Sequence, residues 1–201
     1  MAELHTLPSW AAAGRHGAPH DGVTLAEATI ATAWNVQGDL ARTAFADAAL
    51  RQFGSALPAA PNTTARSGAL HALWLGPHSW LLVTGDPSAL ADLTARRDAF
   101  NAAGGALFDV SASRVAWTIS GPHATDLLAR GCPLDLHPRA FGVGACAQSL
   151  YGHVGVLLVK RNETPAFTLM VARSYARDVW HSLLVAAAPF GATIDAPAPY
   201  A

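Results

Sequence analysis

The feature that most constrains the fold is the order in which strand-like and helix-like segments follow one another. In the first half of the chain, short apolar runs alternate with stretches whose apolar residues repeat at helical spacing. The expected strands are 28–36, 69–75, 80–83 and 106–110, and the expected helices are 40–53 and a segment that begins at Asp86 and ends before Gly104. The resulting order, β-α-β-β-α-β, is typical of a ferredoxin-like unit.

The second half follows the same logic of strands and helices, with one more strand between its two helices, and does not repeat the residues. Its expected strands are 114–120, 145–151, 154–159, 166–171 and 192–194, with one helix opened by Gly121-Pro122 and a long one capped by Ser174. We therefore predict an α+β protein of two tandem ferredoxin-like halves, with mixed or antiparallel sheets and helices packed on one face. The expected limits are an irregular arm over 1–22, halves over 23–110 and 111–195, and an extended tail over 196–201.

The charge content of the chain is low, and two explanations are open. Charged residues make up 13% of the sequence, against about 25% in a typical soluble domain. The abundance of alanine raises the apolar share without any functional meaning. Alternatively, part of the surface is covered by a partner, because obligate interfaces are depleted in charge.

Other bulk properties exclude several classes of protein. The net charge is −1 and no basic block occurs, so a nucleic-acid partner is not expected. No apolar run reaches the length of a membrane span, and the first residues lack the pattern of a signal peptide. The two cysteines, Cys132 and Cys146, do not suggest a disulfide framework. We expect a cytoplasmic protein.

The sequence contains no complete motif for binding a nucleotide or a metal ion. The stretch GVGACA (142–147), with Glu163 further on, has the spacing of a dinucleotide-binding loop. That loop must lie between a strand and a helix, whereas this stretch follows Pro138 and Arg139 and precedes a strand-like run. The histidines form no H-E-x-x-H pattern. The residues therefore predict no catalytic, cofactor-binding or metal-binding site.

The stretch GCPLDLHPRAF (131–141) gathers a thiol, a carboxylate, an imidazole and a guanidinium in a few positions. Cys132 with His137 is the best candidate for a nucleophile and its base. However, Cys132 follows Gly131, the expected end of a helix, and the C-terminal end of a helix dipole disfavours a thiolate. We therefore favour a buried structural cysteine.

Asp135, His137 and Arg139 alternate along this stretch, so an extended backbone would direct all three side chains the same way. Pro133 and Pro138 favour such a path. Two interpretations stand side by side. Asp135 and Arg139 form an ion pair that holds the loop to its own domain, or the three residues belong to an interface with another chain.

A combination of segments resembles a known family. FDVSASRVAWTISGPHATDLLARGCPLDLHPRAF, with GACAQSLY, VARSYARDVWHSLL and the upstream LHALWLGPHSWLLV, looks like the gamma subunit of heterotetrameric sarcosine oxidase. The resemblance covers about residues 70–190, and residues 1–68 add little to it. It implies a non-catalytic structural or assembly subunit of a complex that demethylates sarcosine or a related N-methyl amino acid by oxidation.

A more distant resemblance is to the folate-binding aminomethyltransferases of glycine cleavage. Those enzymes carry a pair of aspartates on a strand after a glycine turn, in a pattern like Gly-x-x-Asp-Asp-Leu-x-Val. The matching stretch here runs from Gly152 to Val159, and Gly155 and Val156 stand in place of the two acids. The resemblance thus implies a fold relative that has lost the folate-handling carboxylate.

The gamma-subunit resemblance also implies where the chemistry takes place. It assigns FAD, FMN, NAD and tetrahydrofolate to partner subunits and none of them to this chain. The implied partners are the large alpha and beta subunits, with a delta subunit in the same complex, and neither nucleic acid nor membrane. The alternative function, which rests on fold likeness alone, is a stand-alone folate-binding enzyme of the aminomethyltransferase type.

Overall fold

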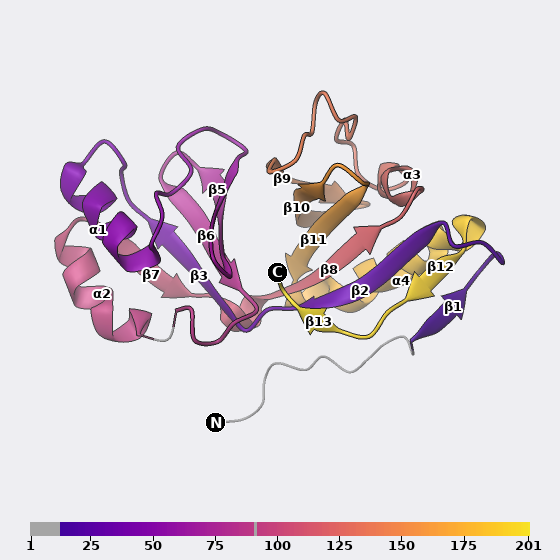
Figure 1. Cartoon of the computed structure of the whole chain (residues 1–201), viewed down its shortest axis with the longest axis horizontal. Coiled ribbons are helices and arrows are strands. Elements are labelled where there is room, and N and C mark those ends of the chain that lie inside the picture. The colour runs from indigo at the N-terminus through magenta and orange to yellow at the C-terminus, as the bar shows by residue number, and fades with distance from the viewer. Residues whose placement is uncertain (1–12, 91) are drawn as a thin grey trace. The chain divides into compact units, whose positions relative to one another are not determined.

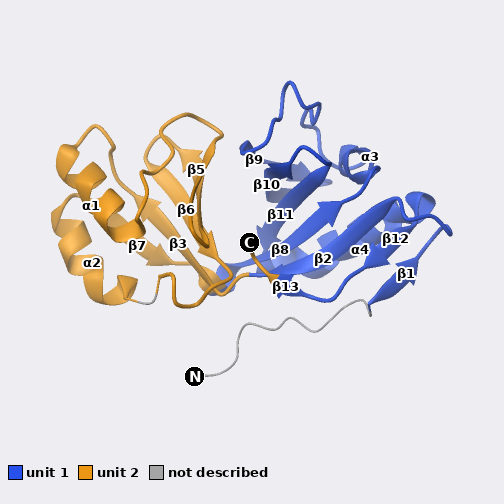
Figure 2. Cartoon of the chain, in the orientation of Figure 1, with its two compact units in different colours: residues 1–29, 112–198 blue, residues 30–111, 199–201 orange. Residues whose placement is uncertain are grey.

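The computed structural model describes residues 13–90 and 92–201, and the chain divides into two compact units (Figures 1 and 2). Unit 1 comprises Met1–Thr29 and Ala112–Ala198, and unit 2 comprises Ile30–Ser111 and Pro199–Ala201. The division is not sequential, because the chain leaves unit 1 after Thr29 and returns to it at Ala112. The first part of the expected arm, residues 1–12, lies outside the described residues.

Unit 2 is a five-stranded antiparallel sheet with two helices packed on one face. The strand order is β4-β5-β6-β3-β7. The elements are β3 (Thr32–Gln37), α1 (Thr43–Phe53), β4 (Thr64–Ser67), β5 (Leu70–Gly76), β6 (Ser79–Thr84), α2 (Leu93–Ala102) and β7 (Ala106–Asp109). Phe45 of α1 and Phe100 of α2 pack against the sheet face that carries Trp80, and all three are fully buried. Their rings contact one another at centroid separations of 5.4 and 6.0 Å.

Most of unit 2 follows the expected order, with one strand added at an edge. Helix α1 ends as predicted at Gly54, which adopts the left-handed conformation at φ 70°. The added strand is β4, in a segment without an apolar run, and Gly68 at φ 56° makes its tight turn to β5. Helix α2 begins later than expected. Asp86 instead accepts hydrogen bonds from the amide and hydroxyl of Ser88 in a separate turn.

Unit 1 is built on a larger mixed sheet, in the order β1-β12-β2-β8-β11-β10-β9. Its elements are β1 (Gly14–His16), β2 (Val23–Thr29), β8 (Arg114–Ser120), α3 (Ala124–Ala129), β9 (Cys146–Tyr151), β10 (Val154–Asn162), β11 (Ala166–Ala172), α4 (Ala176–Ala187) and β12 (Ala192–Ile194). Short 3-10 helices cover Ser111–Ser113, Arg173–Tyr175 and Ala188–Phe190, and β13 is Ala198–Pro199. Strands β12 and β2 pair in parallel, and the other neighbours in this order pair antiparallel.

The core of unit 1 lies between one face of this sheet and both helices. Leu127 and Leu128 of α3 and Leu183 of α4 are fully buried against the strands. Trp180 of α4 stacks on Trp117 of β8, with ring centroids 5.6 Å apart. The class is therefore α+β, as predicted. No helix in the part of the chain that the structure describes is long and apolar enough to cross a membrane.

The expected boundary between the halves differs from the observed one. We expected 23–110 to form one half and 28–36 to form one strand. The structure has two strands, β2 and β3, with Ile30 and Ala31 between them, and each joins a different unit. Because no glycine or proline separates the two strands, the sequence carries no signal for the break.

Both chain ends also differ from expectation. The arm expected to be irregular contains β1, which pairs with β12. The tail expected to be extended contains β13, and its last residues belong to unit 2. Tyr200 is 2% exposed there, and its carbonyl accepts a hydrogen bond from the Gly85 amide. The tail is thus packed into the fold rather than free.

Candidate docking site

The loop over 131–141 begins where α3 ends, and backbone hydrogen bonds fix its start. The Cys132 amide donates to the Leu128 carbonyl at 2.8 Å, and the Gly131 carbonyl accepts from the Gly152 amide at 2.8 Å. Cys132 is 5% exposed, with its Sγ 3.8 Å from the Ser149 hydroxyl. The predicted burial of Cys132 is confirmed. A thiol in this position packs the core and is closed to substrate.

The alternation predicted for this loop is present only from Asp135 to His137, because Pro138 and Ala140 are exposed as well. Asp135, His137 and Arg139 are exposed, whereas Leu136 and Phe141 are buried in the core of unit 1. The backbone is not extended throughout, because the His137 carbonyl accepts hydrogen bonds from the amides of Ala140 and Phe141 and closes a turn. Leu136 and Phe141 therefore anchor the loop to the core of unit 1, and its polar side chains remain on the surface.

Hydrogen bonds within the loop give the three polar residues different roles. Asp135 Oδ1 accepts from the His137 amide at 2.9 Å, and His137 Nδ1 accepts from the Arg139 amide at 3.2 Å. The second bond requires an imidazole with its proton on Nε2. The ion pair considered between Asp135 and Arg139 is not among those of the described residues. The carboxylate shapes the turn, and the guanidinium remains available.

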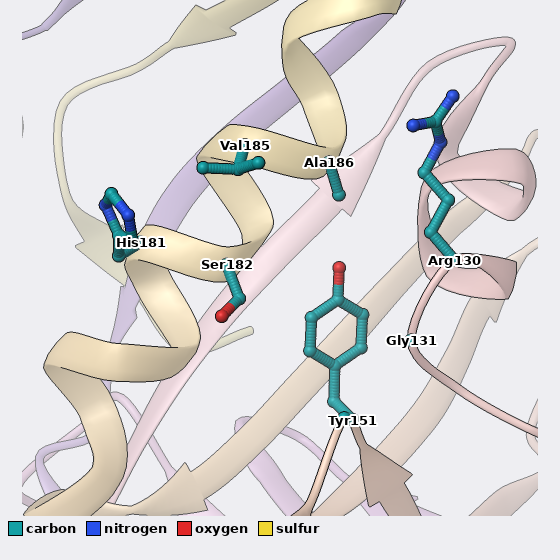
Figure 3. A pocket seen from close by; sticks show the side chains of 8 residues that line it. Arg130, Gly131, Tyr151, His181, Ser182, Val185 and Ala186 are labelled. Atoms are coloured by element: carbon teal, nitrogen blue, oxygen red, sulfur yellow. The ribbon is translucent and has the colours of Figure 1, made fainter.

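A surface groove of about 660 Å³ lies beside the start of this loop (Figure 3). Three segments form its walls: the end of α3, the turn from β9 to β10, and the exposed side of α4. The lining residues are Arg130, Gly131, Tyr151, Gly152, His181, Ser182, Val185 and Ala186. Val185 is an apolar side chain that is 61% exposed. Sequence reasoning missed this groove because its walls come from distant positions.

The chemistry of the groove suits binding better than catalysis. The Arg130 guanidinium lies over the Phe190 ring at 4.8 Å from its centroid. The Tyr151 hydroxyl points between α4 and the segment of Arg130 (Figure 3). Burial raises the pKa of Tyr151 to about 12, against the opposing effect of Arg130, so the phenol stays protonated. The Ser182 hydroxyl donates to the Asp178 carbonyl and is not paired with a base.

The strand that would carry the acids of the aminomethyltransferases has none here. Gly155 is exposed on β10, and a Cβ there would meet nothing within 4 Å. The neighbouring Val156 is 4% exposed and belongs to the core. The position thus has space for an acidic side chain but does not supply one. The groups present do not fit the folate-handling role.

Lys160, near the end of β10, is a buried cation that sequence reasoning missed. It is 3% exposed, and its Nζ lies 4.2 Å from the centroid of the Phe167 ring. Burial lowers the pKa of Lys160, and nearby Glu163 raises it. Lys160 follows Val156 and Leu158 at a spacing of two residues, so all three lie on the same side of the strand. This spacing is the signal that could have placed Lys160 on the core side. No cluster of three potential metal ligands occurs in the described residues.

Comparison with known proteins shows one consistent set of relatives. The chain is 33% identical to the sarcosine oxidase subunit gamma of Corynebacterium sp. (strain U-96), over 69% of this chain and 67% of that protein. It is 39% identical to the corresponding subunit of an Arthrobacter species, over 48% of this chain and 47% of the relative. A third relative, from Corynebacterium sp. (strain P-1), is 36% identical over 59% of this chain and 57% of its own length.

Solved structures agree with these relatives. A chain of the heterotetrameric sarcosine oxidase from Corynebacterium sp. U-96 matches with a TM-score of 0.77 and 30% identity, over 87% of this chain and 88% of that one. The glycine cleavage system aminomethyltransferase T from Bartonella henselae matches with a TM-score of 0.54 at 14% identity, which shows a shared fold. It covers 89% of this chain and 48% of the enzyme. The model of the sarcosine oxidase gamma subunit family matches residues 37–189, and the chain belongs to that family.

Proposed function

We propose that this chain is a non-catalytic assembly subunit of a heterotetrameric sarcosine oxidase-type complex. The single observation that carries the proposal is the family match over residues 37–189, which spans most of both units. The complex would oxidise the N-methyl group of sarcosine or a related amino acid. The chemistry would take place in other subunits, and this chain would stabilise their assembly.

The composition of the candidate site supports a binding role. Its groove contains a cation, a protonated phenol and an apolar wall. Its one lining hydroxyl that could act as a nucleophile, on Ser182, is bonded to a backbone carbonyl. Neither cysteine is exposed. Binding of a partner surface needs none of the nucleophile and base pairing that covalent catalysis requires.

The cofactors and partners follow from the same proposal. FAD, FMN, NAD and tetrahydrofolate would be held by the partner subunits. Those partners would be the large alpha and beta subunits and a delta subunit, assembled in the cytoplasm. The absence of an acid at Gly155 and Val156 supports placing folate outside this chain. The competing function, a stand-alone folate enzyme, would need a carboxylate in this strand.

Asp135, His137 and Arg139 would contribute to docking with unequal roles. Asp135 would hold the turn through its bond to the His137 amide. His137 would present its Nε2 proton as a donor, because Nδ1 already accepts from the Arg139 amide. Arg139 would offer its guanidinium to a carboxylate of the partner in a bidentate contact. This arrangement supports the interface interpretation over local pairing.

The proposal is tested by purifying the chain alone and together with the oxidase subunits. Alone, it should show no flavin absorbance, no sarcosine turnover and no heat on titration with tetrahydrofolate. Co-expressed with the subunits, it should elute with them in one complex. Stoichiometric flavin or turnover by the isolated chain would contradict the assembly role. Micromolar folate binding by the isolated chain would favour the alternative enzyme.

A further inference from the structure

Strand β7 is an open edge of the sheet in unit 2. It pairs with β3 on one side, and no strand of the described residues lies on the other. The Val110 amide donates to the Ala33 carbonyl at 2.9 Å. Because such bonds alternate along an antiparallel pair, the backbone groups of Phe108 also face β3. Those of Leu107 and Asp109 therefore point outward, where a further strand would bind.

A groove of about 420 Å³ runs along this edge. It is lined by Arg97 and Asn101 of α2 and by residues 106–109 of β7. Leu107 is buried on the helix side of the sheet, while Phe108 points to the opposite side and is 50% exposed. A strand added to β7 would place alternate side chains on these two sides. One set would enter the groove beside α2, and the other would cover Phe108.

The groove also contains a cation with one buried nitrogen that lacks an acceptor. Arg97 lies over the Trp34 ring at 5.7 Å from its centroid, and its Nε is buried without a hydrogen-bond partner in the described structure. The Trp34 Nε1 is buried and unbonded in the same way. By contrast, the neighbouring Arg96 pairs with Asp92 at 3.6 Å. A buried donor without an acceptor is uncommon in folded proteins, so an incoming group is expected to supply one.

We propose that β7 binds an extended segment of a partner subunit as an additional strand of the sheet. The segment carries an aspartate or glutamate that faces Arg97 and an apolar side chain that packs on Phe108. Main-chain hydrogen bonds to Leu107 and Asp109 provide the affinity, and the two side-chain positions provide the specificity. This inference rests on the proposed function, because it takes the partner from the oxidase-type complex.

The first test is hydrogen exchange at single-residue resolution, on the wild-type chain alone and in the complex. In the isolated chain, the amides of Leu107 and Asp109 exchange quickly and that of Phe108 is protected. In the complex, Leu107 and Asp109 become protected while Phe108 changes little. This alternating pattern identifies strand addition, because docking through side chains alone does not select alternate amides. Rapid exchange of Leu107 and Asp109 within an intact complex overturns the proposal.

The second test measures assembly of variants with the co-expressed subunits. F108S and R97Q should each weaken retention of the partners by about tenfold, as expected for central interface residues. The matched controls are L50S, since Leu50 is also 50% exposed in unit 2, and R96Q. If the two controls and the two variants all assemble equally well with the partner subunits, the edge site is refuted.

Protection of the same amides in a dimer of this chain alone would show that a second copy is the occupant. Failure of the wild-type chain to assemble would instead overturn the proposed function, and this inference with it.

Discussion

The hydroxyl of Tyr200 lies 2.7 Å from Nδ1 of His71, although 129 positions separate the two residues in the sequence. Both side chains are 2% exposed. His71 belongs to β5, and the Arg66 guanidinium of the neighbouring β4 donates to the backbone oxygen of Ala201 at 3.0 Å. These contacts attach the final residues to the sheet of unit 2.

The first prediction concerns this buried hydrogen bond. Tyr200→Phe keeps the ring but removes the hydroxyl, so one buried polar group at His71 loses a partner. Because the Arg66 guanidinium also lies 3.4 Å from Nδ1 of His71, we expect the free energy of unfolding to fall by about 0.5–1.5 kcal/mol, the net contribution of one hydrogen bond, as measured by urea denaturation. Tyr175→Phe is the control, because Tyr175 is 51% exposed. Equal stability of the two variants would mean that the bond contributes nothing in solution.

The second prediction concerns the exposed guanidinium of the docking loop. Arg139→Ala should leave the melting temperature of the isolated chain unchanged, because the side chain has no ion pair within the described structure. It should weaken co-purification with the partner subunits, at a cost of about 2–5 kcal/mol if the contact is buried and charged. Arg51→Ala on α1, which also removes an exposed arginine, is the control. A destabilised chain that assembles normally would make Arg139 a local brace.

The third prediction concerns the two thiols. Cys132 and Cys146 are 5% and 0% exposed. Reaction with a thiol reagent such as dithionitrobenzoate requires access to the thiolate, so we expect almost no labelling of the native protein. Both thiols should react at once in concentrated urea. Rapid labelling of one thiol under native conditions would contradict the structural role of Cys132.

The fourth prediction concerns stability at high pH. Burial raises the pKa of Tyr151 from 10.0 to about 12, so the folded state retains a proton that the unfolded state has lost. The stability linked to this group is therefore complete below about pH 10 and is lost as the pH rises towards 12. Tyr151→Phe should make the decline over this interval shallower. Ultraviolet titration near 295 nm should show a matching late-ionising phenol in the wild-type protein, absent from the variant.

The sequence predicted local features better than long-range ones. The exposure of Asp135, His137 and Arg139 was predictable because the neighbouring prolines and the buried Leu136 act within a few residues. The end of α1 at Gly54 was predictable because a glycine that ends a helix acts on the residues next to it. The separation of β2 from β3 was not, because both segments have the composition of strands and only their partners differ.

The candidate site was predicted in part. The loop that contains Arg139 was found because its polar residues are close in sequence. The groove was not, because Arg130, Tyr151 and His181 come from separate segments that only the folded chain brings together. The edge at β7 could not be anticipated either. Which strand lies at an edge depends on the pairing of the whole sheet, and short strands carry no mark of it.

The insertion of unit 2 between β2 and β8 has a consequence for synthesis on the ribosome. Strand β2 is made early, yet its neighbours β8 and β12 are encoded far downstream, with Thr24 opposite Ser120 and Val23 opposite Ala192. Most of unit 2 emerges before either neighbour exists, so it can fold while β2 remains an unpaired apolar segment. Such distant pairings slow folding and prolong exposure of the strand. Co-translational capture by a chaperone should therefore fall on nascent chains that end between β2 and β8.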